Sequence, residues 1–178
     1  MSYRKERAYL QQTDSESSYV TGVPEESLRD LFTEILEQGV HGFCFSLYEE
    51  GQKPGDTITE EQVRRRMQVL KPYTQWIRSF SCTDGNELIP KVAKELGLKT
   101  LVGAWLGNDP EVNEREIKGL VKLAKEGLVD IAAVGNEVMY RKDLTEEELL
   151  AFIYDVKKQI PGIKVGYVDA YYEFSHRP

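Results

Sequence analysis

The 178-residue chain has few of the residues that the commonest metal and nucleophile sites require. Its two cysteines, Cys44 and Cys82, show no CxxC or Cys/His spacing, so a zinc site is not expected. Both fall inside apolar strand patterns, which predicts buried, reduced thiols. His41 and His176 are its two histidines, which disfavours a histidine-based triad or metal cage. The sequence therefore predicts neither a metal nor a cofactor.

The chain also lacks a basic surface and long apolar runs. A net charge of −7 and a pI near 5.0 disfavour a nucleic-acid partner, which would require a basic face. The densest basic run, residues 64–66, lies in a helical pattern and is interpreted as a solvated helix face. No apolar run is long enough to span a membrane, and the N-terminus lacks the apolar core of a signal peptide. We expect a cytoplasmic protein without a membrane partner.

Helical and strand patterns alternate along most of the chain. Residues 1–22 are polar and aperiodic and are predicted to form a disordered or loose tail, whereas residues 23–178 are predicted to form one domain. Helix starts are indicated by Pro24, by Asp109 before Pro110, and by capping-box patterns at Thr59 and Thr145. Strands are expected at residues 42–48, 75–82, 99–106, 129–138 and 163–172.

This alternation predicts an α/β fold with parallel strands and helices packed outside them. A doubly wound sheet and a (β/α)8 TIM barrel both fit the pattern. No strand is followed by the Gly-rich turn of a dinucleotide fold, and several strands end in polar or aromatic residues, which favours the barrel. Such a barrel needs about 250 residues, so we expect one truncated to about five β/α units. The open barrel edges predict self-association.

The stretch at residues 129–138 is central to the prediction of function. An apolar strand pattern from Ile131 to Val134 runs into Gly135, Asn136 and Glu137, which a buried strand does not require. Polar residues at the end of a barrel strand are typical of an active site. The alternative is structural: Glu137 could be a buried partner of Arg78 that fixes the barrel interior.

The strand-end motifs resemble those of the family 17 glycoside hydrolases, the β-1,3-glucanase family, and especially its microbial members. Residues 131–138, Ile-Ala-Ala-Val-Gly-Asn-Glu-Val, are similar to the fourth strand of that family, which carries the general acid/base. The resemblance extends over residues 40–174 and includes the segments Gly-Phe-Cys-Phe at 42–45, Ile-Arg-Ser-Phe at 77–80, Val-Gly-Ala-Trp-Leu-Gly at 102–107 and the fifth strand at 163–172.

The resemblance implies a retaining mechanism, in which two carboxyl groups lie about 5–5.5 Å apart. Glu137 would be the general acid/base, Asn136 would bind the sugar hydroxyl next to the reacting carbon, and Arg78 would orient the nucleophile. Further contacts to substrate are predicted for Tyr48, Trp105, Asp169 and Tyr171. Packing is the alternative for the aromatic residues, and loop capping is the alternative for Asp169. The nucleophilic glutamate of the family follows its seventh strand in a Glu-x-Gly-Trp-Pro-like context, which this chain lacks, and Glu173 is a poor substitute.

Hydrolysis of a β-glucan is thus the first hypothesis, with a β-1,3 linkage favoured by the resemblance and an oligo- or polysaccharide as partner. A β-glucan transglycosylase is a variant of the same hypothesis. A non-catalytic carbohydrate-binding or assembly fragment of a barrel enzyme is the second. An unrelated barrel isomerase or aldolase is the third, and it would require a phosphate-binding turn after the late strands.

Overall fold

The computed structural model describes residues 22–175 and 177. The predicted tail at residues 1–22 therefore lies almost entirely outside the described residues. The chain divides into two compact units, one that ends at Gln38 and one that begins at Gly39. Helix α2 (Glu25–Gln38) belongs to the first unit and none of its residues is buried. It ends as predicted before Gly39, whose φ of +83° is a conformation that glycine adopts readily.

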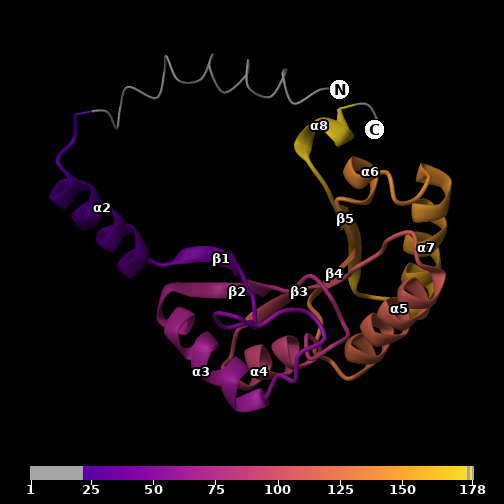
Figure 1. Cartoon of the computed structure of the whole chain (residues 1–178), viewed down its shortest axis with the longest axis horizontal. Helices are drawn as coiled ribbons and strands as arrows, with labels where there is room; N and C mark the ends of the chain where they lie inside the picture. Colours follow the sequence, from indigo (N-terminus) through magenta and orange to yellow (C-terminus); the bar gives the residue numbers. More distant parts are fainter. Residues whose placement is uncertain (1–21, 176, 178) are drawn as a thin grey trace. The chain divides into compact units, whose positions relative to one another are not determined.

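The second unit contains one parallel sheet of five strands in the order β1-β2-β3-β4-β5 (Figure 1). A doubly wound sheet reverses its strand order at a switch point, whereas here every strand lies beside its neighbour in sequence. This topology confirms the prediction of an α/β fold that supplies about five units of a (β/α)8 barrel. The strands are β1 (Val40–Cys44), β2 (Thr74–Arg78), β3 (Lys99–Ala104), β4 (Ile131–Asn136) and β5 (Lys164–Val168).

The longer helices of this unit lie along the outer face of the curved sheet (Figure 1). The Asp109 side chain caps the helix that begins at Pro110 by accepting hydrogen bonds from two backbone amides of its first turn, and Thr145 forms the complete predicted capping box with Glu148. Only half of the predicted box forms at Thr59, because the Gln62 side chain donates instead to the Leu47 carbonyl over 2.8 Å. The helices are α3 (Glu60–Leu70), followed by the 3-10 turn η2 (Lys71–Tyr73), α4 (Leu88–Glu95), α5 (Pro110–Lys125) and α7 (Glu146–Gln159).

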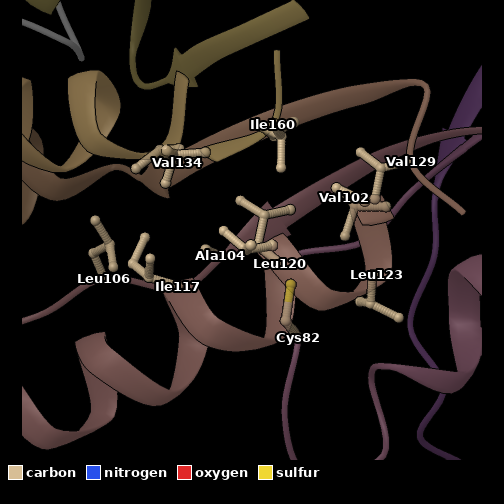
Figure 2. Close-up of a cluster of buried hydrophobic side chains, with 14 of the residues drawn as sticks. Cys82, Val102, Ala104, Leu106, Ile117, Leu120, Leu123, Val129, Val134 and Ile160 are labelled. Atoms are coloured by element: carbon tan, nitrogen blue, oxygen red, sulfur yellow. The ribbon is translucent and has the colours of Figure 1, made fainter. Parts of the chain in front are cut away.

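Two clusters of buried apolar side chains join the helices to the sheet. In the larger cluster, Leu120 on α5 lies against Val102 and Ala104 on β3, with Cys82 beneath them (Figure 2). The smaller cluster packs α3 and α4 against β1 and β2 through residues such as Val63, Ile77 and Ile89. Burial of these side chains supplies most of the driving force for the outer layer.

The opposite face of the sheet is the inner face of the barrel, and the described residues leave much of it uncovered. The register places Cys44, Arg78, Leu101 and Ile131 in one row across this face. Cys44 is exposed there, so the prediction that both thiols are buried is wrong for Cys44 and confirmed for Cys82. The apolar pattern correctly predicted a strand that includes Cys44. Burial of the Cys44 side chain would in addition require other residues packed against the inner face of the sheet, which the pattern does not reveal.

Two short helices follow strand ends where none was predicted. Helix α6 (Val138–Arg141) begins directly after Glu137, and α8 (Tyr171–Phe174) replaces the last part of the strand predicted at residues 163–172. Strand β5 ends at Val168 because the next residue, Asp169, turns its carboxylate to the backbone of α6. Among the described residues, no helix is both long enough and apolar enough to cross a membrane.

Candidate active site

The predicted site residues all follow or end strands at the carboxyl edge of the sheet. Arg78 is the last residue of β2, and Asn136 is the last of β4, with Glu137 directly after it. Tyr48 follows β1, Trp105 follows β3, and Asp169 and Tyr171 follow β5. In a barrel of parallel strands this edge carries the active site.

A β-bulge in β4 decides which face Asn136 occupies. Ala133 is opposite Gly166 on β5 and Asn136 is opposite Val168, so three steps along β4 match two along β5. Simple alternation from Ala133 would direct Asn136 toward the outer helices. The extra residue brings it instead to the inner face. Gly135 permits the bulge, because its φ is +87° and an added Cβ would lie 2.8 Å from Val138 Cγ2.

On the inner face Asn136 is paired with Arg78. Arg78 Nη2 donates a 2.6 Å hydrogen bond to Asn136 Oδ1, and the guanidinium also lies 4.6 Å from the centroid of the Phe80 ring. This bond fixes the orientation of the amide and leaves Nδ2 of Asn136 without a partner among the described residues. The structural alternative of a buried Glu137 paired with Arg78 is wrong, because Glu137 is exposed.

Glu137 itself occupies a left-handed backbone conformation, with φ of 53° and ψ of 30°. Its amide donates to Val168 O over 2.8 Å, and its carbonyl accepts from the Arg141 amide over 2.9 Å. Its carboxylate is exposed and makes no hydrogen bond or ion pair with the described residues. Such strain in a residue other than glycine costs about 1–2 kcal/mol and is common at functional sites. The turn thus presents a carboxyl group that is available for proton transfer.

Asp169 and Tyr167 hold the turn from β5. Asp169 Oδ2 accepts from the amides of Met139 and Tyr140 over 3.1 and 3.3 Å, and it also accepts a short hydrogen bond from the Tyr167 hydroxyl. Burial, assisted by the neighbouring Asp169 carboxylate, raises the pKa of Tyr167 well above its ordinary value. The carboxylate of Asp169 therefore caps helix α6 rather than a loop, and contact of Asp169 with substrate stays a prediction.

Trp105 is held at both its backbone and its ring. Its amide donates to Glu116 Oε2 over 3.0 Å, and the Arg141 guanidinium lies 4.4 Å from the centroid of its ring. Glu116 is 2% exposed and also accepts from Ser81 Oγ, Cys82 N and Thr83 Oγ1 over 2.6, 2.8 and 2.5 Å. Trp105 remains 38% exposed, which leaves indole surface available to a ligand.

The remaining candidates, Tyr48 and Tyr171, have contacts with other residues than Arg78, Asn136 and Trp105. Tyr48 is half-buried and packs against the smaller core cluster. Tyr171 is exposed in α8, and its ring lies edge-on to Tyr172 at a centroid distance of 5.5 Å. Glu173 is engaged in an ion pair with Arg177, and its weakness as a substitute for the nucleophile stays a prediction.

A groove of about 1170 Å³ lies elsewhere, between α5 and α7. Its lining includes Ile117, Val121 and Phe152 with charged residues around them, but none of the predicted site residues. It is therefore not the candidate active site. Within residues 22–175 and 177, no cluster of three or more His, Cys, Asp or Glu side chains is arranged to hold a metal ion.

Sequence reasoning missed Glu116 and Arg141. Glu116 lies on the buried helical stripe of α5 with Ile117 and Leu120, and a charged residue on such a stripe is a detectable signal. Arg141 follows Glu137 by four residues, a spacing that becomes informative only once α6 is known to be helical.

Comparison with known proteins relates the chain to glycoside hydrolases. A family model described as the BtgE/BtgC glycoside hydrolase domain matches residues 42–178. A glucan 1,3-beta-glucosidase of Arthroderma benhamiae is 29% identical over 126 residues, which are 68% of this chain and 40% of that protein. The glucan endo-1,3-beta-glucosidase btgC of Emericella nidulans is 30% identical over 111 residues, which are 57% of this chain and 17% of that protein. The chain thus spans less than half the length of these relatives.

A solved structure is similar as well. It is an active-site mutant of Rhizomucor miehei beta-1,3-glucanosyltransferase in complex with laminaritriose, with a TM-score of 0.67 and 29% identity, over 78% of this chain and 52% of that chain. These matches confirm the resemblance to the family 17 β-glucanases. Because the family model covers most of the residues, the chain belongs to the BtgE/BtgC glycoside hydrolase domain family.

Proposed function

We propose that this chain carries the acid/base half of a retaining glycoside hydrolase that acts on β-1,3-linked glucan. The observation that carries the proposal is the bulge in β4, which brings Asn136 onto Arg78 and leaves the Glu137 carboxylate exposed at the strand end. Relatives named as glucan 1,3-beta-glucosidases support the substrate class. The neighbouring structure holds laminaritriose, which supports an oligosaccharide ligand.

In this proposal Glu137 donates its proton to the glycosidic oxygen as the bond to the sugar breaks. A second carboxylate attacks the anomeric carbon, and Glu137 then takes a proton from the incoming water. Because Oδ1 of Asn136 accepts from Arg78, its Nδ2 is oriented to donate to the hydroxyl beside the reacting carbon. The proposal assigns Arg78 the orientation of the nucleophilic carboxylate, because the planar guanidinium fork suits a carboxylate partner.

The part of the chain that the structure describes offers no well-placed nucleophile, so turnover by the chain itself is the decisive question. The test is release of reducing sugar from a β-1,3-glucan by the chain and by Glu137→Gln, with Glu114→Gln on the exposed side of α5 as the matched control. Turnover requires a second carboxylate, supplied from within the chain or by a partner copy, and the proposal expects any sugar release by the parent to be lost in Glu137→Gln and kept in Glu114→Gln. Release that is equal in all three proteins would overturn the role of Glu137.

Binding separates the second candidate from the first. A chain that binds laminaritriose without releasing sugar is the non-catalytic carbohydrate-binding fragment of the alternative hypothesis. The similarity to a glucanosyltransferase supports transglycosylation as a variant of the first candidate. Products longer than the laminaritriose that was added would identify this reaction. Absence of both binding and release would contradict the proposed function.

A further inference from the structure

Arg141 connects two strand ends of the candidate site. Its Nη2 donates to the Leu106 carbonyl over 2.8 Å, and its Nη1 donates a short hydrogen bond to the Asn136 carbonyl. Its Nε donates to Asp143 Oδ2 over 2.7 Å. The three nitrogens thus bind three separate acceptors, after β3, at the end of β4 and after α6.

The same guanidinium also lies over the Trp105 ring, with Cζ 4.4 Å from the ring centroid. Arginine can form the planar fork and the stack at once, whereas lysine supplies a single charged point. The backbone amide of Arg141 also bonds the Glu137 carbonyl over 2.9 Å. One residue therefore contacts both the predicted aromatic platform and the turn that presents the predicted acid/base.

We propose that Arg141 is a positioning residue, which holds the Trp105 indole as a saccharide platform at a fixed place relative to Asn136 and Glu137. The saccharide part of this inference rests on the proposed function, while the immobilisation of the indole does not. Glu116 holds the Trp105 amide independently of Arg141, so loss of the Arg141 guanidinium is expected to free the ring while the Trp105 backbone keeps this anchor.

Trp105 can report on its own position. The chain has two tryptophans, and Trp76→Phe leaves Trp105 as the single tryptophan, whose emission is excited selectively at the red edge of the absorption band. In that background, Arg141→Lys and Arg141→Met are expected to increase the fast component of Trp105 anisotropy decay. Both are also expected to weaken laminaritriose binding, followed by Trp105 emission, by about tenfold or more, because a displaced platform loses its contact with the sugar. Indole motion and affinity that stay within about twofold of the parent would overturn the proposal.

Arg64→Lys is the matched control. The Arg64 side chain is 28% exposed, close to the 24% of Arg141, and it is ion-paired with Glu60 and Glu95. The Arg64→Lys substitution should therefore change neither the anisotropy decay nor the affinity for laminaritriose. If Arg141→Met fails to fold, Asp143→Asn loosens the same guanidinium and should shift both readouts in the same direction. A parent that does not bind laminaritriose contradicts the proposed function, and the anisotropy decay still decides whether Arg141 positions the indole.

Discussion

Arg78 on β2 donates a 2.6 Å hydrogen bond to Asn136 on β4, across the intervening strand β3. The bond depends on the bulge in β4, since regular alternation would place the two side chains on opposite faces of the sheet. It makes the amide at the end of β4 a fixed part of the inner face, with the Glu137 turn directly beyond it.

Loss of this bond should have a measurable but moderate cost. Arg78→Met removes a charged donor from Asn136, and we expect the free energy of unfolding to fall by about 1–2 kcal/mol. The loss is moderate because Nε of Arg78 is buried without a partner, and its removal offsets part of the cost. Urea denaturation measures the difference. Arg65→Met, whose side chain is 64% exposed, should stay within about 0.5 kcal/mol of the parent.

The strained backbone of Glu137 predicts a trade between stability and function. Glu137→Gly relieves the left-handed conformation and should raise the free energy of unfolding by about 0.5–1 kcal/mol, although it removes the predicted acid/base. Glu137→Ala also lacks the carboxylate but keeps the strain, so it serves as the matched control. Thermal denaturation of the pair would contradict the account if the alanine variant were the more stable one.

Glu116 should be the most sensitive carboxylate that the structure identifies on α5. Glu116→Leu leaves the amides of Cys82 and Trp105 without their acceptor, and we expect a loss of about 3 kcal/mol or more. Glu116→Gln should cost only about 1 kcal/mol, because its oxygen can face the two amides while the Ser81 and Thr83 hydroxyls accept from its nitrogen. Glu114→Leu on the exposed side of α5, at 66% exposure, controls for helix effects. Equal losses for all three variants in urea denaturation would argue against the hydrogen-bond account.

Tyr167 should make stability depend on alkaline pH. Burial, then the Asp169 carboxylate, raises the pKa of Tyr167 above the value near 10 of an unfolded chain. The folded state therefore holds this proton more tightly, so its stabilising effect is complete below about pH 10 and is lost as the pH rises further. Tyr167→Phe should be about 1 kcal/mol less stable than the parent at pH 8, and the difference should shrink above pH 10.

Urea unfolding between pH 8 and 11 measures this dependence. Tyr154→Phe, on the exposed face of α7, controls at pH 8 for the loss of a surface phenol. A difference between Tyr167→Phe and the parent that stays constant across the whole pH range would contradict the role assigned to the Tyr167 proton.

The open sheet predicts that the 178-residue chain self-associates when it is expressed alone. Strand β1 pairs with β2 on one side only, and its sequence Val-His-Gly-Phe-Cys has none of the lysines or prolines that protect edge strands. Analytical ultracentrifugation should find oligomers, and His41→Lys, which places a charge on that edge, should reduce them. A clean monomer at micromolar concentration would contradict the prediction.

Much of the architecture follows from local sequence. Apolar strand patterns, helical stripes and the caps at Asp109 and Thr145 depend on neighbours in the chain, so they predicted the alternating elements and their parallel arrangement. The polar ends of these strands placed Arg78, Asn136 and Glu137 at one edge, because parallel strands share a direction. The motif around Glu137 could be identified from the sequence because its residues are consecutive in the chain.

Only the tertiary structure decided how these residues meet. The face that Asn136 occupies depends on one extra residue in the register between β4 and β5, which periodicity cannot reveal. The exposure of Cys44 depends on what covers the inner face, and the contacts of Arg141 depend on two strand ends that are 30 residues apart. Local pattern thus determined the elements and the residues at their ends, whereas strand register and long-range hydrogen bonds determined the geometry of the candidate site.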